Sequence, residues 1–271
     1  MSVLLHISDT HFGTEEAPVV QALQKLAREQ NPDALVLSGD ITQRARAAQF
    51  AAARAFCDSL GIARILTLPG NHDIPLLNVA ARVFSPYAGY TAAFGRDLEP
   101  VIELPDAIVI GVNTTRPERH KDGEVSPEQV LRVVGLLEGL PRQRLRIVVT
   151  HQPACVMRPE DENDRLHGGD EAVRAWSEAG ADLVLGGHIH LPYVSDVCAR
   201  VKETRRPMYC VQAGTALSHR VRHGSPNSVN IVRWQAPAAD APRVCHLERW
   251  DYDLADGRFE LTHPYELKLG E

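Results

Sequence analysis

The chain lacks any apolar stretch long enough to span a membrane, and its N-terminus lacks the basic-then-apolar pattern of a secretion signal. We therefore expect a protein without a membrane role. Cysteine is scarce, with five residues, an odd number, and no CxxC pair among them. This usage predicts core thiols in a reducing compartment, with the cytoplasm as the expected location.

An excess of positive charge is also missing, because 29 lysines and arginines stand against 35 aspartates and glutamates, for a net charge of −6. This balance argues against a protein that grips extended nucleic acid by its phosphate backbone. The chain also has no low-complexity linker and no internal repeat. Composition therefore gives no reason to divide the 271 residues into separate units.

Five short polar motifs do stand out, in a fixed order along the chain. They are Asp9-Thr10-His11, Gly39-Asp40, Gly70-Asn71-His72-Asp73, Thr150-His151 and Gly187-His188-Ile189-His190. Together they supply Asp, His and Asn ligands with no thiolate. This ligand set suits a pair of divalent ions of intermediate hardness, such as Mn, Fe, Zn or Co.

Each motif follows a short, largely apolar run that predicts a buried strand. These runs cover residues 3–7, 34–37, 62–68, 145–149 and 181–185. Open α/β sheets carry their ligands beyond the carboxyl ends of such strands, so all five motifs are expected at one sheet edge. Glycines before three of the motifs let the backbone turn sharply and pass close to an ion. This arrangement predicts a two-metal hydrolase.

Helical patterns alternate with these strands up to Pro192, and after it the sequence shows mainly strand patterns. Helices are expected over residues 18–29, 45–60, 126–137 and 168–179. Antiparallel strands are expected over residues 208–211, 228–234, 244–252 and 259–262. We therefore predict an α/β fold with two sheets. Because the motifs extend from position 9 to position 190, we predict one domain over residues 1–271, with a β-rich C-terminal part from about 192.

The set D-x-H, G-D, G-N-H-D, H and G-H-x-H resembles the calcineurin-like metallophosphoesterase superfamily. It is most similar to the bacterial cyclic-nucleotide-phosphodiesterase-like branch, whose members open with a phrase like His6-Ile7-Ser8-Asp9-Thr10-His11. The match covers about the first three-quarters of the chain. The resemblance implies a four-layer α/β/β/α sandwich of two mixed sheets, with a dimetal centre between the sheet ends.

The resemblance also implies a ligand for each ion. The first ion would be held by Asp9, His11 and His190, the second by Asn71, His151 and His188, with Asp40 bridging the two. A hydroxide between the ions would act as the nucleophile, and the assembled centre would carry a charge of about +1, which favours an anionic phosphate.

In the superfamily the histidine of G-N-H lies beside the leaving group. This implies that His72 is the general acid, close to the transferred phosphorus together with Asn71, and that Asp73 orients it. Arg44 occupies an arginine position of the superfamily's protein phosphatases without their Asp and Gly neighbours, which argues against a protein phosphatase. We expect Arg44 either to bind a phosphate oxygen or to be an exposed arginine at a helix start. The cation-rich segment 218–223 either binds an anion or forms a solvated loop.

The predicted function is a dinuclear-metal-dependent phosphohydrolase, a phosphodiesterase acting on a small nucleotide-like diester. The sequence Asp73-Ile74-Pro75-Leu76 departs from many cyclic-nucleotide phosphodiesterases and argues against a cyclic AMP assignment. The alternatives are a phosphomonoesterase, then a nuclease or a non-catalytic scaffold. The expected partner is a small phosphoester, and homo-oligomer formation stays open. His6 is expected to be structural, and His120 has no supporting context.

Overall fold

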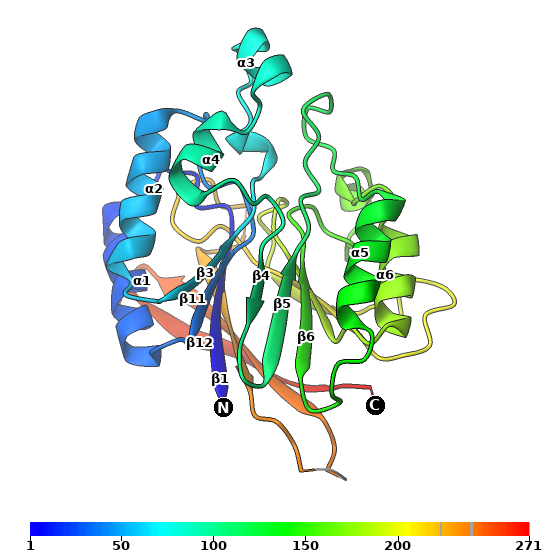
Figure 1. The fold of residues 1–271 in the computed structure, drawn as a ribbon. Coiled ribbons are helices and arrows are strands. Elements are labelled where there is room, and N and C mark those ends of the chain that lie inside the picture. Colours follow the sequence, from blue (N-terminus) through cyan, green and yellow to red (C-terminus); the bar gives the residue numbers. More distant parts are fainter. Residues whose placement is uncertain (223, 239–240, 271) are drawn as a thin grey trace.

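The computed structural model describes residues 1–222, 224–238 and 241–270, which form two sheets of six strands each (Figure 1). The first sheet has the order β12-β11-β10-β1-β2-β3. Its strands are β1 (Ser2–Ile7), β2 (Ala34–Leu37), β3 (Arg64–Thr67), β10 (Ser228–Trp234), β11 (Val244–Asp253) and β12 (Arg258–Lys268). β1, β2 and β3 are parallel, and β10 joins β1 antiparallel, with Leu5 opposite Ile231.

The second sheet has the order β4-β5-β6-β7-β9-β8. Its strands are β4 (Val101–Glu103), β5 (Ala107–Gly111), β6 (Leu145–Val149), β7 (Leu183–Gly186), β8 (Tyr193–Asp196) and β9 (Tyr209–Gln212). The four inner strands are parallel, whereas β4 and β8 are antiparallel edges. β5, β6 and β7 are buried throughout, as continuous apolar runs in a covered parallel sheet require.

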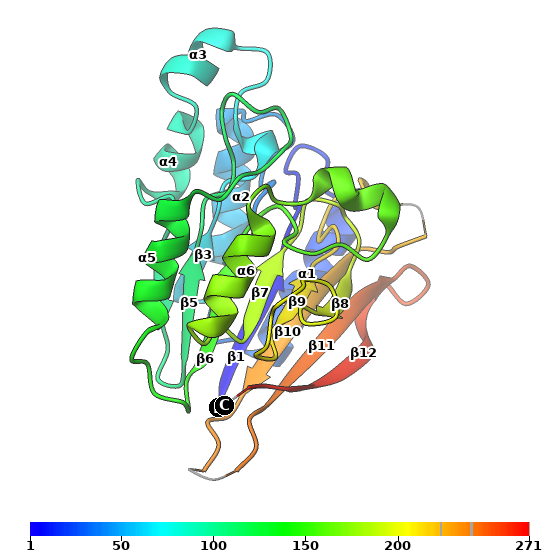
Figure 2. The ribbon, with the colours of Figure 1, turned by 90° about the vertical axis from the view of Figure 1, so that its right-hand side faces the viewer.

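Helices cover the outer face of each sheet (Figure 2). α1 (Ala17–Gln30) and α2 (Ala47–Ser59) lie on the first sheet, and α5 (Pro127–Leu137) and α6 (Gly169–Glu178) lie on the second. The start of α5 follows from its sequence, because Ser126 accepts a hydrogen bond from Gln129 N and Pro127 needs no donor there. Two short helices, α3 (Val79–Phe84) and α4 (Ala88–Phe94), connect the sheets, and short 3₁₀ turns cover Asn71–Asp73 and Pro159–Asp164.

Side-chain alternation along the strands produces the layers. Leu5 and Ile7 of β1 pack under α1 and α2, whereas Leu4 points into the core between the two sheets. A third core lies between the second sheet and the helices α5 and α6. The predicted four-layer α/β/β/α sandwich of two mixed sheets is confirmed.

One strand prediction was wrong in its direction. β9 (Tyr209–Gln212) lies one residue beyond the predicted run 208–211; it pairs antiparallel with β8 as predicted, but its other neighbour, β7, is parallel to it, so it does not belong to an antiparallel tail. A short buried apolar run has the same composition in either direction, so its pairing follows from the fold and not from the run itself. β10, β11 and β12 continue the first sheet beside β1. We propose on this basis that the chain forms one domain. No helix within the described ranges is long and apolar enough to cross a membrane.

Candidate metal centre

The seven predicted ligands meet at the carboxyl ends of parallel strands from both sheets. Asp9 and His11 follow β1, Asp40 follows β2, Asn71 follows β3, His151 follows β6, and His188 and His190 follow β7. Parallel strands all end at the same edge, which brings together Asp9 and His190, 181 positions apart in the chain. Asp9, His11, Asp40 and His151 are almost completely buried there.

The ligand atoms form two groups that share Asp40. Candidate atoms of Asp9, His11, Asp40 and His190 lie within 4.8 Å of one another, as do those of Asp40, His151 and His188. Asp40 Oδ2 lies 3.8 Å from His11 Nε2, and Asp40 Oδ1 lies 3.3 Å from His151 Nε2. Asn71 Oδ1 joins the second group at 3.2 Å from His151 Nε2. The Asp40 carboxylate therefore lies between two ligand groups, as a bridging ligand must.

Hydrogen bonds behind the histidines orient their nitrogens for metal binding. His151 Nδ1 donates to Ser38 O over 2.8 Å, and His190 Nδ1 donates to the carbonyl of Arg220. Each of these bonds uses the Nδ1 proton, so Nε2 is the nitrogen that faces the ligand cluster and can bind a metal ion. His188 Nδ1 is buried and has no hydrogen-bond partner among the described residues. A buried, unpartnered nitrogen beside two carboxylates fits a divalent ion, so the residues present suit a dimetal centre.

The electrostatics of the cluster agree with this fit. Burial opposes ionisation of Asp40, yet His151 and His72 hold the pKa of that carboxyl well below its usual value. Burial likewise opposes the imidazolium of His151, yet the Asp40 and Asp9 carboxylates raise its pKa to about 9. Burial lowers the pKa of His11 to about 3. In the metal-free protein a proton on His151 thus balances carboxylate charge, and divalent ions would displace that proton on binding.

The backbone at this edge is strained. Among the residues that the structure describes, five of the eight non-glycine residues with positive φ are predicted ligands. They are Asp9 (φ 52°), His11 (44°), Asp40 (48°), His188 (72°) and His190 (56°). Left-handed backbone at a residue with a Cβ costs of order 1–2 kcal/mol. Strain of this kind is concentrated where the surrounding structure imposes it for a functional geometry.

Two glycines permit close approach of the backbone. A Cβ at Gly70 would lie 2.1 Å from Asp40 N, and a Cβ at Gly187 would lie 2.0 Å from Ser8 Oγ. Both distances are far below van der Waals contact. Gly70 and Gly187, which open the third and fifth motifs, are therefore required by packing between loops, as well as by turn geometry.

His72 is half-buried beside the ligands, with its ring edge-on to that of His11 at 4.8 Å between centroids. Its backbone N donates to Asp40 Oδ1 over 2.8 Å. Its Nδ1 lies 3.0 Å from Gln43 O, and a carbonyl can only accept, so Nδ1 carries a proton. This bond fixes the ring orientation and leaves Nε2 for proton exchange with a substrate.

Asp73 has contacts that differ from the predicted ones. Its carboxylate is 1% exposed and accepts hydrogen bonds from the backbone N of Gly70, Ile41 and Thr42 and from Thr42 Oγ1, at 2.7–3.0 Å. It makes no hydrogen bond with the His72 ring, which Gln43 orients instead. Asp73 therefore holds the turn after β2 against the turn after β3, and so positions Asp40 relative to Asn71.

A cavity of about 400 Å³ opens over the ligands, and cations line it. Lys121 Nζ lies 2.8 Å from Asp164 Oδ1, and Arg222 Nη1 lies 2.8 Å from Asp161 Oδ1, so both are neutralised. Arg220 differs, because its Nη1 donates over 3.0 Å to the neutral amide oxygen of a glutamine, Gln43 Oε1. Arg220 is therefore the cation of this wall that has no carboxylate partner among the described residues.

The lining of this cavity could be anticipated from the sequence only in part. Arg220 and Arg222 belong to the segment predicted to bind an anion or to form a solvated loop, whereas His223 lies outside the described residues. His120 and Lys121 line the cavity but follow no strand and belong to no motif, so nothing in the sequence marked them. Arg44 does not line this cavity. It is exposed and borders a small space next to His72.

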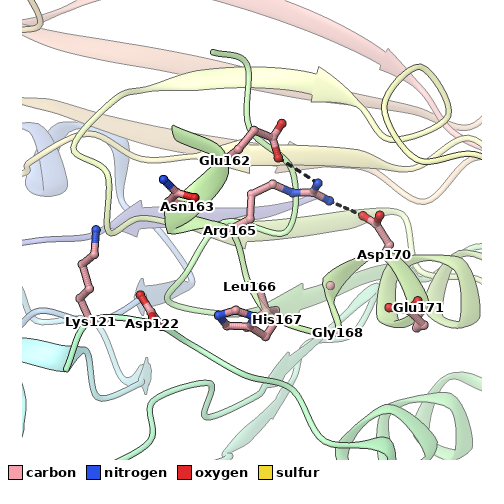
Figure 3. A pocket seen from close by; sticks show the side chains of 11 residues that line it. Lys121, Asp122, Glu162, Asn163, Arg165, Leu166, His167, Gly168, Asp170 and Glu171 are labelled. Atoms are coloured by element: carbon pink, nitrogen blue, oxygen red, sulfur yellow. Dashed lines mark hydrogen bonds and ion pairs between the residues drawn. The ribbon is translucent and has the colours of Figure 1, made fainter. Parts of the chain in front are cut away.

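A second cavity, of about 600 Å³, adjoins the first through Lys121 (Figure 3). Arg165 lies between Glu162 and Asp170 and forms ion pairs with both. Carboxylates outnumber cations along this wall, which includes Asp122 as well. The cavity therefore offers no unpaired positive charge for a phosphate group.

His6 lies in β1, three residues before Asp9, and is completely buried. Its Nε2 lies 3.0 Å from Ser38 Oγ, and its Nδ1 accepts from Asn230 Nδ2 over 3.3 Å. Burial lowers the pKa of His6 to about 3, so its ring is neutral in the folded protein. His6 thus joins three strands, in agreement with a structural role.

Comparison with known proteins adds independent information. A sequence model of the family described as calcineurin-like phosphoesterase matches residues 2–192. A curated protein from Synechococcus sp., described as a probable cyclic nucleotide phosphodiesterase, is 25% identical over 185 residues, which cover 67% of each chain.

Solved structures share the fold at low sequence identity. A purple acid phosphatase from yellow lupin (Lupinus luteus) seeds superposes with a TM-score of 0.69 at 12% identity, over 98% of this chain and 53% of that one. This chain thus spans about half the length of the lupin protein. A dimetal phosphatase from Danio rerio superposes with a TM-score of 0.66 at 10% identity, over 99% of both chains. At such identities the two structures bear on the fold alone.

Proposed function

The chain belongs to the calcineurin-like phosphoesterase family, and from this premise we propose that it is a dinuclear-metal-dependent phosphodiesterase acting on a small nucleotide-like diester. The observation that carries the proposal is the pair of ligand groups sharing Asp40, with His72 beside them. The family assignment agrees with the resemblance expected from the five motifs. The name of the cyanobacterial relative supports the diester over the alternatives.

In this proposal Asp9, His11 and His190 would hold one ion and Asn71, His151 and His188 would hold the other, with Asp40 shared by both groups. When bound, the ions would supply positive charge for the phosphate and would make a water molecule acidic enough to serve as a nucleophile at neutral pH.

The chain's own groups then act on the substrate. The Arg220 guanidinium, held by Gln43, binds a non-bridging phosphate oxygen at the cavity wall. His72 holds a proton at Nε2 and delivers it to the leaving oxygen, in an orientation set by the Nδ1 bond to Gln43. Asn71, beside His72, lies close to the phosphorus.

The charges of the cavity favour a diester over a monoester. Lys121 and Arg222 are already neutralised by Asp164 and Asp161, which leaves Arg220 to meet a substrate anion. A diester carries one negative charge, which this arrangement can match. The proton of His72 passes to the leaving oxygen, so a monoester dianion would need, besides Arg220, a second arginine or lysine without a carboxylate partner at this wall.

The test compares bis(4-nitrophenyl) phosphate with 4-nitrophenyl phosphate on Mn²⁺-loaded protein, with 2′,3′- and 3′,5′-cyclic nucleotides in the same panel. We expect kcat/KM to favour the diester by about tenfold or more, which is about 1.4 kcal/mol in transition-state binding. Asp40→Ala serves as the control for contaminating activity. A clear preference for the monoester would replace this proposal with a phosphomonoesterase.

A further inference from the structure

The space around His72 continues away from the metal ligands. A small space of about 30 Å³ lies between Asn71, His72 and His120 on one side and Arg44 and Leu76 on the other. Its first three residues also line the cavity over the ligands. Because these residues are shared, the small space adjoins the cavity over the ligands, and His72 lies at the boundary between the two.

Beyond the small space is a cavity of about 730 Å³, which shares Arg44 and Leu76 with it. Ala81 of α3 lines this cavity, and α3 itself projects above the sheet edge at the top of Figure 1. Its volume is in the range of small-molecule sites. This cavity is therefore large enough for an organic group.

The walls of this outer cavity combine apolar side chains with unpaired cations. Most of its lining is apolar and comes from Ala45, Pro75, Leu76, Leu77, Ala81 and Ala88. Arg44 and Arg46 complete the wall, and both are exposed. Neither forms a salt bridge with any residue in the described part of the chain, in contrast to Arg165 in the cavity of Figure 3.

Specific hydrogen bonds hold the segment that carries the apolar wall. Arg82 donates through Nη2 to Arg119 O over 2.7 Å and through Nη1 to Pro75 O over 3.3 Å. Tyr87 Oη donates to Thr115 O over 3.1 Å. The segment is thus tied to the loop that carries His120. It nevertheless leaves Leu77 89% exposed, a position at which an apolar ligand would remove the side chain from water.

We propose that the outer cavity binds the leaving-group half of the substrate, and that this half is an amphiphilic anion. Its apolar body, aromatic or alkyl, would lie against Leu76 and Leu77, and its second anionic group would meet Arg44 and Arg46. The position beyond His72 assigns this half to the leaving group, because His72 delivers its proton to the leaving oxygen. That assignment rests on the proposed function, whereas binding of an amphiphilic anion does not.

The binding test uses 8-anilinonaphthalene-1-sulfonate, an aromatic sulfonate whose fluorescence rises in apolar surroundings. We expect saturable binding to the full chain, weakened about tenfold or more by Arg44→Ala/Arg46→Ala and by Leu76→Asp. Matched controls are Arg28→Ala at the end of α1 and Leu131→Ser on the exposed face of α5, which should bind the dye as the unaltered chain does. Thermal unfolding of each variant establishes that it is folded.

Two binding results would overturn the proposal. One is dye affinity that is unchanged in the folded Arg44→Ala/Arg46→Ala variant. The other is dye affinity that is lost in Phe84→Ser and in no other variant, which would mean that the dye binds to the outer face of α3. A third assay measures cosedimentation with phosphatidylglycerol vesicles. Sedimentation that depends on Phe84 would mean that a lipid surface, and not a free amphiphile, meets this segment.

The kinetic test compares methyl 6-sulfo-2-naphthyl phosphate with methyl 2-naphthyl phosphate, two diesters that differ in the second anion of the leaving group. We expect kcat/KM to favour the sulfonated ester about tenfold, and this ratio to fall to about one in Arg44→Ala/Arg46→Ala. A ratio near one in the unaltered enzyme, with both esters hydrolysed, would refute the leaving-group assignment and leave the phosphodiesterase standing. Arginine-dependent dye binding without hydrolysis of any diester would instead refute the phosphodiesterase.

Discussion

Replacing His72 with alanine separates metal binding from proton transfer at this site. The bond from the backbone N of residue 72 to Asp40 Oδ1 does not involve the ring, so His72→Ala should keep both ligand groups intact. What disappears is the imidazole whose Nδ1 is held by Gln43. Loss of a positioned general acid costs about 10²–10⁴-fold in rate, or about 2.7–5.4 kcal/mol in the barrier.

The size of the loss should depend on the leaving group. Diphenyl phosphate releases a poor leaving group that needs a proton, so kcat in His72→Ala should fall by the full factor. Bis(4-nitrophenyl) phosphate releases nitrophenolate, which needs none, and its kcat should change by less than about threefold. Elemental analysis should find the same metal content as in the unaltered protein, and added imidazole should restore part of the lost rate.

The control is His246→Ala, a change at an exposed histidine of β11. Equal losses on both diesters, with both ions retained, would mean that His72 positions the substrate and donates no proton. Loss of an ion in His72→Ala would assign the ring to the metal centre, and either result would refute the reasoning from the Gln43 bond.

Three further predictions concern the ligands and their support. Asp40→Ala should lose bound metal and activity together, because both ligand groups share its carboxylate, and Asp58→Ala on α2 should lose neither; two tightly bound ions in the Asp40 variant would contradict the assignment. Gly70→Ala should lower the metal content, and it should lower the free energy of unfolding by about 1–3 kcal/mol, because the new Cβ would lie 2.1 Å from Asp40 N. Gly135→Ala on α5 meets nothing within 4 Å, so metal content and the free energy of unfolding should not fall there. His6 should make the metal-free protein acid-sensitive, because its pKa is 6.5 unfolded but about 3 when buried, so stability is full above pH 6.5 and declines toward pH 3. Between pH 7.5 and 5.5, urea unfolding should show a loss of stability that is about 1.4 kcal/mol smaller in His6→Gln than in the unaltered protein, because His11 titrates in both.

The parts of the fold that could be predicted are those marked by a local sequence pattern, either an apolar run or a helix cap. The runs at 34–37 and 145–149 coincide with β2 and β6, because buried parallel strands are unbroken apolar sequences closed by polar turns. The helix over 126–137 is marked by its own cap, Ser126, with Pro127 after it. The ligand motifs were visible because each follows such a strand.

Contacts between distant segments were not predictable from pattern. β4, β5 and the short helices α3 and α4 escaped prediction, because three to seven residues carry too little periodicity to be recognised. The His72 ring is oriented by the backbone carbonyl of Gln43, and because every residue type has this carbonyl, the sequence cannot indicate the bond. The pairing of Arg220 with Gln43 joins side chains 177 positions apart, and neither belongs to a predicted contact.

The left-handed backbone at Asp9, His11, Asp40, His188 and His190 has a consequence for how such a chain would evolve. Glycine adopts this conformation without a Cβ penalty, so a ligand-to-glycine change at these positions relieves strain while it removes a metal ligand. The proposed metal ligands are thus also residues whose replacement by glycine would relieve backbone strain in the metal-free fold. Once selection for hydrolysis ends, mutation should therefore erode this edge first and leave the sandwich intact as a stable, metal-free binding protein.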